Sequence, residues 1–227
     1  MLAAFAVAYA TAAHAAERRY TVTDFDRVQI EGPFQVVLTT GRAPSARASG
    51  SNRAIDAVSV EVEGRTLKLR PNRAAWGGYP GHGAEAAAIE LSTYGLRSAS
   101  VNGSGSLEID KVKTMQFSLA LSGSGRIGVT NLEADAATVG LLGAGTVSLG
   151  GKVKGLKATV QGSGSLAAGS LAAEDLQLNA DTAGKIVVGA RRTAKVIATG
   201  SGETIISGTP ACSVTRKGSG SVACGRD

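Results

Sequence analysis

Residues 103–125 read GSGSLEIDKVKTMQFSLALSGSG and hold one full unit of a repeat that runs through most of the chain. Between the two Gly-Ser-Gly triplets, apolar residues alternate with polar or small ones, first at Leu107 and Ile109 and then from Phe117 to Leu121. Alternation with a period of two predicts β-strands that bury one face. One unit therefore contains two short strands and two corners.

The triplet recurs at steps of 18 to 20 residues, and Thr182-Ala183-Gly184 is a degenerate copy. Its glycines are Gly103, Gly105, Gly123, Gly125, Gly143, Gly145, Gly162, Gly164, Gly200, Gly202, Gly218 and Gly220. No unit can bury its apolar face alone, so the units must stack. The sequence predicts an all-β fold, a parallel β-helix of about seven coils of 18–20 residues. Glycine at the corners would supply positive φ and let neighbouring coils approach closely.

The segments outside the repeat suggest how the chain is divided. Residues 1–16 are apolar and contain Ala13-His14-Ala15 just before the charged Glu17, which predicts a signal peptide and hence export to the periplasm, the cell surface or the medium. A buried N-terminal helix is the alternative. Residues 17–227 would form one β-solenoid domain, with N-terminal coils and a cap over 17–95 and regular repeats over 96–227. No later stretch is apolar enough to span a membrane.

One loop, residues 71–84, stands out by composition. It contains Trp76, Tyr79 and His82, which are the only Trp of the chain, one of its four Tyr and the only His after the leader. Aromatic residues on a loop are typical of binding sites. The loop is therefore a candidate binding loop, and the alternative is that Trp76 packs on the flank of the solenoid.

The formal net charge of +6 raises the question of nucleic-acid binding, but the charges alternate in sign from coil to coil. The corner pairs are Lys111 and Lys113, Glu133 and Asp135, Lys152 and Lys154, Glu174 and Asp175, and Arg191 and Arg192. Coils ~4.8 Å apart would stack these groups beside opposite charges. The pattern predicts a ladder of ion pairs and no nucleic-acid partner, with a binding patch as the alternative.

Cys212 and Cys224 are the only cysteines, and both fall at positions that alternate inward in the last two coils. In an exported protein such a pair favours a disulfide bond. It would fasten the final coil. Two separate buried thiols are the alternative.

The sequence lacks the material for the common catalytic and metal sites. With His82 as the only histidine after the leader, a Ser-His-Asp triad or a His-rich zinc site has almost no candidates. Residues 123–128 match the Gly-x-Gly-x-x-Gly pattern, but a strand follows where a dinucleotide site needs a helix. We expect no catalytic, cofactor-binding or metal-binding residues.

Residues 24–38, DFDRVQIEGPFQVVL, followed by residues 60–67, VEVEGRTL, and the serial Gly-Ser-Gly turns resemble the bacterial DUF2807 family, the putative auto-transporter adhesin, head GIN domain. The resemblance implies a right-handed β-solenoid that is exported to the cell envelope, and it implies no known catalytic residues. The chain departs from the family pattern at residues 92–96 and at the Thr182 turn.

The sequence leaves three functions open. The first is a non-catalytic envelope or surface module that binds an envelope glycan or a surface protein. The alternative is a polysaccharide-active enzyme, a lyase or glycoside hydrolase, because parallel β-helices host such chemistry. The third is self-assembly into oligomers through the strand edges at the solenoid ends.

Overall fold

The computed structural model describes residues 16–72 and 87–225. The candidate binding loop with Trp76, Tyr79 and His82 lies outside the described residues, as does all of the expected signal peptide except Ala16. Among the residues that are described, no helix is both long and apolar enough to cross a membrane.

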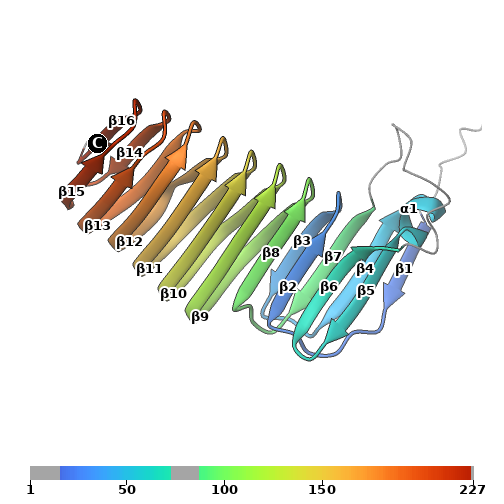
Figure 1. Cartoon of the computed structure of the whole chain (residues 1–227). Coiled ribbons are helices and arrows are strands. Elements are labelled where there is room, and N and C mark those ends of the chain that lie inside the picture. The colour runs from blue at the N-terminus through green and yellow to red at the C-terminus, as the bar shows by residue number, and fades with distance from the viewer. Residues whose placement is uncertain (1–15, 73–86, 226–227) are drawn as a thin grey trace, which may run out of the picture.

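The central strands each make up most of one coil and lie side by side in parallel order (Figure 1). Their bounds are β9 Ser106–Gly123, β10 Arg126–Gly143, β11 Thr146–Gly162, β12 Ser165–Thr182 and β13 Ile186–Ala198. Equivalent residues pair across coils, so that Ile127 faces Leu107 on one side and Val147 on the other. The structure confirms a β-solenoid, with about six turns where the sequence predicts about seven.

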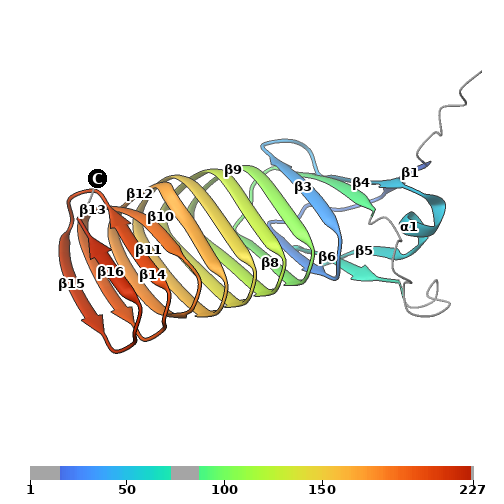
Figure 2. The same ribbon diagram turned by 90° about the horizontal axis from the view of Figure 1, so that it is seen from above.

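Columns of apolar side chains fill the interior of the winding that is seen from above in Figure 2. One column runs through Leu107, Ile127, Val147, Leu166 and Ile186, all at most 1% exposed. Burying a side chain of this size stabilises the fold by ~1.5–3 kcal/mol relative to leaving it exposed. Each coil shares its columns with both neighbours, so no coil has a core of its own.

At the N-terminal end the order of strands in space differs from their order in the chain. β2 lies between β6 and β8, and β3 lies between β7 and β9. The chain thus builds one coil from β2 and β3, moves outward, and later returns to the far side of that coil with β8. The bounds are β2 Arg27–Glu31, β3 Gln35–Thr40, β6 Thr66–Pro71, β7 Ala88–Thr93 and β8 Ser98–Gly103.

Antiparallel strands end the parallel stack at this side. β4 (Ser45–Gly50) pairs antiparallel with β7, β1 (Ala16–Tyr20) pairs antiparallel with β4, and β5 (Val58–Glu63) pairs antiparallel with β6. The short helix α1 (Asn52–Asp56) connects β4 to β5, and its N-terminus is capped by the hydroxyl of Ser51, which accepts from the backbone N–H of Ala54.

The two glycines of a corner have different roles. In the first four turns the first glycine has positive φ, as at Gly123 with φ +114, where an L-residue would be strained. The second glycine does not have positive φ. At Gly125 a Cβ atom would instead lie 2.3 Å from the carbonyl oxygen of Gly105 in the preceding coil. The expectation of positive φ is therefore wrong for Gly125. Glycine is needed at this position because the neighbouring coils approach too closely for a Cβ atom.

The geometry of the corner changes at the degenerate turn. Thr182 is buried, and its hydroxyl donates to the carbonyl oxygen of Gly164 and accepts from the backbone N–H of Gly184. From this turn onward none of the predicted turn glycines has positive φ. The threonine side chain thus supplies hydrogen bonds at a corner that other coils form with a glycine of positive φ.

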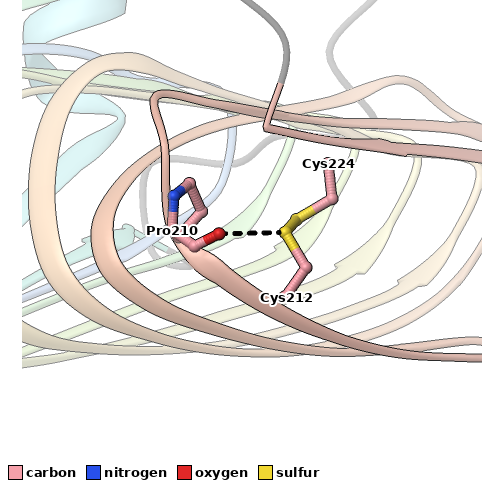
Figure 3. The surroundings of a disulfide bond; sticks show 3 residues. All are labelled: Pro210, Cys212 and Cys224. Carbon is pink, nitrogen blue, oxygen red and sulfur yellow. Dashed lines mark hydrogen bonds between the residues drawn. A yellow bond between two sulfur atoms is a disulfide. The ribbon is translucent and has the colours of Figure 1, made fainter.

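The C-terminal end is formed by short strands and by the predicted disulfide bond. The strands are β14 Glu203–Ser207, β15 Ala211–Arg216 and β16 Ser221–Cys224. Cys212 and Cys224 are joined, with their Cα atoms 6.4 Å apart, and the carbonyl oxygen of Pro210 lies 3.5 Å from the Cys212 sulfur (Figure 3). Cys212 pairs with the buried Ala194, so its register is inward, but it is exposed because β13 is the only described strand that pairs with β15.

Candidate functional site

Two open depressions lie on the outside of the solenoid and share Thr114 and Met115. Their volumes are about 560 and 720 Å³. We call the combined surface the corner groove. It is lined by residues 27, 97, 98, 113–118, 133–136, 138, 152–154, 172, 174 and 191.

The groove is hollow because side chains become shorter from one coil to the next. Thr114 pairs with Ala134, and Gln116 pairs with Ala136, which in turn pairs with Gly155. Met115 stands beside this floor with 75% of its surface exposed, the largest exposed fraction among the large apolar side chains of the described residues. The register of the coils thus produces a small apolar patch with polar walls.

One wall of the groove is the predicted ion-pair ladder. Glu133 lies between two lysines of neighbouring coils, 3.6 Å from Lys113 and 3.5 Å from Lys152. Lys154 lies 2.7 Å from Asp135, and the hydrogen bond to that carboxylate raises the pKa of Lys154, as does its negative charge. The predicted cross-coil pairing is confirmed at these positions.

The ladder continues beyond the groove but does not include every predicted residue. Asp175 binds Arg192 and accepts from the hydroxyl of Thr193, and these two hydrogen bonds lower the pKa of the Asp175 carboxyl group. Lys111 has Asn131 beside it in the next coil, so no acid faces it there. Its backbone carbonyl instead accepts from the hydroxyl of Thr40.

The other end of the groove carries guanidinium groups held by one buried carboxylate. Asp26 is 7% exposed, and its Oδ2 lies 3.0 Å from Nε of Arg65 and 3.7 Å from Nε of Arg97. Its Oδ1 lies 3.9 Å from Nε of Arg27 and accepts no hydrogen bond in the described chain. Arg65 is also 3.0 Å from the carboxylate of Asp24, so two negative charges face three positive ones and this end of the groove remains positively charged.

Sequence reasoning did not identify this arginine cluster. Asp26 and Arg27 are adjacent in the chain, but Arg65 and Arg97 come from distant segments. The backbone N–H of Asp26 donates to the carbonyl oxygen of Arg65, and that of Arg97 donates to the carbonyl oxygen of Asp26. Only the pairing of β2 with β6 and β8 brings the four residues together, and no local sequence motif predicts this pairing.

The groove as a whole is a charged surface suited to binding. Six cationic and three acidic side chains line it, and two of the acids, Glu133 and Asp135, are each bound by lysine. Within residues 16–72 and 87–225, no group of three or more His, Cys, Asp or Glu side chains is placed to hold a metal ion. The arrangement can attract and orient a negatively charged partner.

Several solved structures share this fold over nearly their whole length. A putative adhesin from Bacteroides fragilis matches with a TM-score of 0.85 and 21% identity, covering 93% of this chain and 97% of the other. A putative lipid binding protein from Parabacteroides distasonis matches with a TM-score of 0.73 and 22% identity, covering 94% and 98%. A putative adhesin from the same species has a TM-score of 0.69 at 18% identity, covering 92% and 96%. No curated protein matches the sequence.

The family comparison agrees with the resemblance noted from the opening motif and the serial turns. The model of DUF2807, described as "Putative auto-transporter adhesin, head GIN domain", matches residues 24–210. This match spans both the N-terminal strands and almost all of the regular coils, so the chain belongs to the DUF2807 family.

Proposed function

We propose that the protein is a non-catalytic binding module of the cell envelope or cell surface, and that it binds its partner, an envelope glycan or a surface protein, at the corner groove. The observation that supports this most is the exposed Met115 between two charged walls. An apolar contact point surrounded by charges is typical of recognition surfaces. The description of the family as an adhesin points in the same direction.

The chemistry of the groove favours binding over polysaccharide cleavage. Glycoside hydrolysis needs a pair of carboxyl groups, one of them with a raised pKa so that it can donate a proton. Glu133 and Asp135 instead contact lysines of neighbouring coils. Carboxylates that are already paired with lysines suit a structural ladder better than proton donation to a substrate.

The interior of the solenoid offers little support for a lipid-binding role. Apolar columns fill the space between the strands, as shown by Leu119, Val139 and Ala158, which are at most 1% exposed. An acyl chain would have to displace these side chains. We therefore place the partner outside the coils.

We also propose that residues 1–16 are removed on export and that residues 17–227 act as one domain. β1 begins at Ala16 and covers β4, so cleavage beside this residue would leave nearly all of the strand in place. Intact-mass analysis of protein from the native host should give an N-terminus at Ala16 or Glu17. Recovery of uncleaved Met1 from the envelope would contradict the proposal.

The binding function is tested with paired variants at exposed apolar positions. The chain lacking residues 1–16 is applied to a glycan array and to envelope extracts, and captured partners are identified by mass spectrometry. Met115→Asp should abolish capture because it removes the apolar contact. Val37→Asp, at a residue 54% exposed outside the groove, should leave capture unchanged.

Two results would overturn the proposal. The first is a partner that both variants bind as well as the wild type, which would move the site away from the groove. The second is a bound polysaccharide that is shortened during incubation, which would show the alternative, an enzyme.

A further inference from the structure

The outer face that continues from the groove toward the C-terminus contains a straight line of polar residues. Register places Arg27 beside Ser98. The line then runs through Ser98, Ser118, Thr138, Lys157, Gln177 and Lys195, each paired with the equivalent residue in the next coil. We call these residues, with Arg27, the polar column. All are exposed except Ser98, which is half-buried.

The polar column contains hydroxyl, amide and cationic groups but no carboxylate. Lys157 and Lys195 form no ion pair with any described residue, in contrast to the lysines of the ladder. The neighbouring outward column is small or polar over its first five residues and ends at an apolar one; it runs through Ser100, Ala120, Gly140, Thr159, Asn179 and Ile197. Lys157 and Lys195 thus present positive charge that no described carboxylate pairs, whereas Arg27 lies 3.9 Å from the carboxylate of Asp26 that it shares with Arg65 and Arg97.

The spacing of the cations favours a linear polymer that is less densely charged than nucleic acid. At ~4.8 Å per coil, Lys157 and Lys195 lie ~10 Å apart and Arg27 lies ~19 Å from Lys157. Duplex DNA carries one negative charge per ~1.7 Å of its axis, and single strands are bound largely by stacking on aromatic side chains. The polar column has neither dense charge nor aromatic residues. It does have side-chain hydrogen-bonding groups between the cations, at the pitch of the coils.

We propose that the polar column binds a linear acidic polysaccharide laid along the solenoid axis, with its acidic groups on Arg27, Lys157 and Lys195 and its hydroxyl groups on the side chains between them. The N-terminal part of this column overlaps the corner groove, because both include Arg27, Ser98, Ser118 and Thr138. The inference rests on the proposed binding function and specifies the chemistry of its ligand.

The test uses defined polymers and the chain lacking residues 1–16. Calorimetric titration with polygalacturonate should show binding that weakens with salt, and titration with neutral dextran should show none. Lys157→Glu combined with Lys195→Glu should weaken polygalacturonate binding by about tenfold or more, because two attractive contacts become repulsive.

A matched control separates local contact from overall charge. Lys111→Glu combined with Arg126→Glu changes the net charge equally but lies on other faces of the coils, and it should weaken binding by less than about threefold. Circular dichroism checks that both double variants remain folded.

Three outcomes would overturn the inference: no binding of polygalacturonate, equal losses in both double variants, or binding of duplex DNA that matches polygalacturonate in affinity. If polygalacturonate does not bind while Met115 still governs capture of an envelope partner, the polysaccharide inference fails and the proposed function stands. If polygalacturonate binds along the column while Met115→Asp has no effect on any capture, the groove assignment fails instead.

Discussion

At the scale of single residues, the corner glycines show that one residue type can be required for two physical reasons. Gly123 has positive φ, whereas Gly125 lacks it but has no room for a Cβ atom beneath the preceding coil. Gly155 meets neither condition, because a Cβ atom there would lie 3.8 Å from its closest neighbour, the carbonyl oxygen of Asp135. The consequences of replacing a glycine should therefore differ sharply within one coil repeat.

We expect Gly125→Ala to destabilise the protein by more than ~1 kcal/mol, because the coils must move apart to admit the methyl group. Gly155→Ala should be neutral or stabilising by ~0.4–1 kcal/mol, since it restricts the unfolded chain without a clash. Thermal unfolding of both variants beside the wild type measures the difference. Equal melting temperatures for the two variants would contradict the close-approach role of Gly125.

At the scale of structural elements, register converts a pattern in the sequence into contacts. The parallel pairing of β9, β10 and β11 places Glu133 against Lys113 and Lys152. A single exposed ion pair contributes little to stability, but Glu133 contacts a lysine in each of the two neighbouring coils. Reversing the lysine charges of one coil therefore removes its ion pairs with the preceding coil and places like charges beside each other.

Lys152→Glu combined with Lys154→Glu should lower the melting temperature, because four acidic groups then face one another across β10 and β11. In 1 M salt, where the Debye length is about 3 Å, most of the loss should be recovered. The corresponding double alanine variant should lose much less. Scanning calorimetry at low and high salt measures each effect.

The control for this prediction is Lys157→Glu combined with Lys195→Glu, which changes net charge equally at lysines that have no ion-pair partner in the described chain. This control should melt close to the wild type. If both double reversals cost the same, overall charge rather than the ladder determines the effect.

At the scale of the whole molecule, a solenoid must protect its two ends. The N-terminal end is covered by antiparallel strands and α1, as Figure 2 shows. At the C-terminal end the disulfide joins β15 to β16, and Arg216 stands at an inward position next to Ala198. Its guanidinium donates to the carbonyl oxygen of Gly220. An inward-pointing charge on an edge strand opposes pairing with another chain.

Removal of the disulfide should loosen the C-terminal coil before the rest of the protein. Cys212→Ser combined with Cys224→Ser is expected to cost roughly 2 to 3 kcal/mol locally, because the closing of the intervening loop is no longer enforced. Hydrogen exchange should show faster exchange in β15 and β16 and unchanged protection in β10, since each coil depends mainly on its neighbours. A uniform loss of protection along the solenoid would contradict this expectation.

Arg216→Val should promote association through the C-terminal end, because it replaces a charge with a β-branched apolar residue on an edge strand. Sedimentation velocity should detect larger species than in the wild type. Arg126→Val, which removes an outward-facing arginine from a central coil, serves as the control and should sediment as the wild type does. Identical sedimentation of the two variants would mean that Arg216 does not prevent association through the C-terminal end.

The repeat itself is readable from the sequence because its cause is local. Steps of 18 to 20 residues bring identical corners into register, and this predicts the parallel stack, the ion pairs of Glu133 and the pairing of Cys212 with Cys224. The shuffled strand order at the N-terminal end, the arginines around Asp26 and the corner groove depend on contacts between distant segments. A period in the sequence specifies which residues stack, but it contains no information on how unrepeated strands pair or where short side chains leave a hollow, and these features were decided only by the tertiary structure.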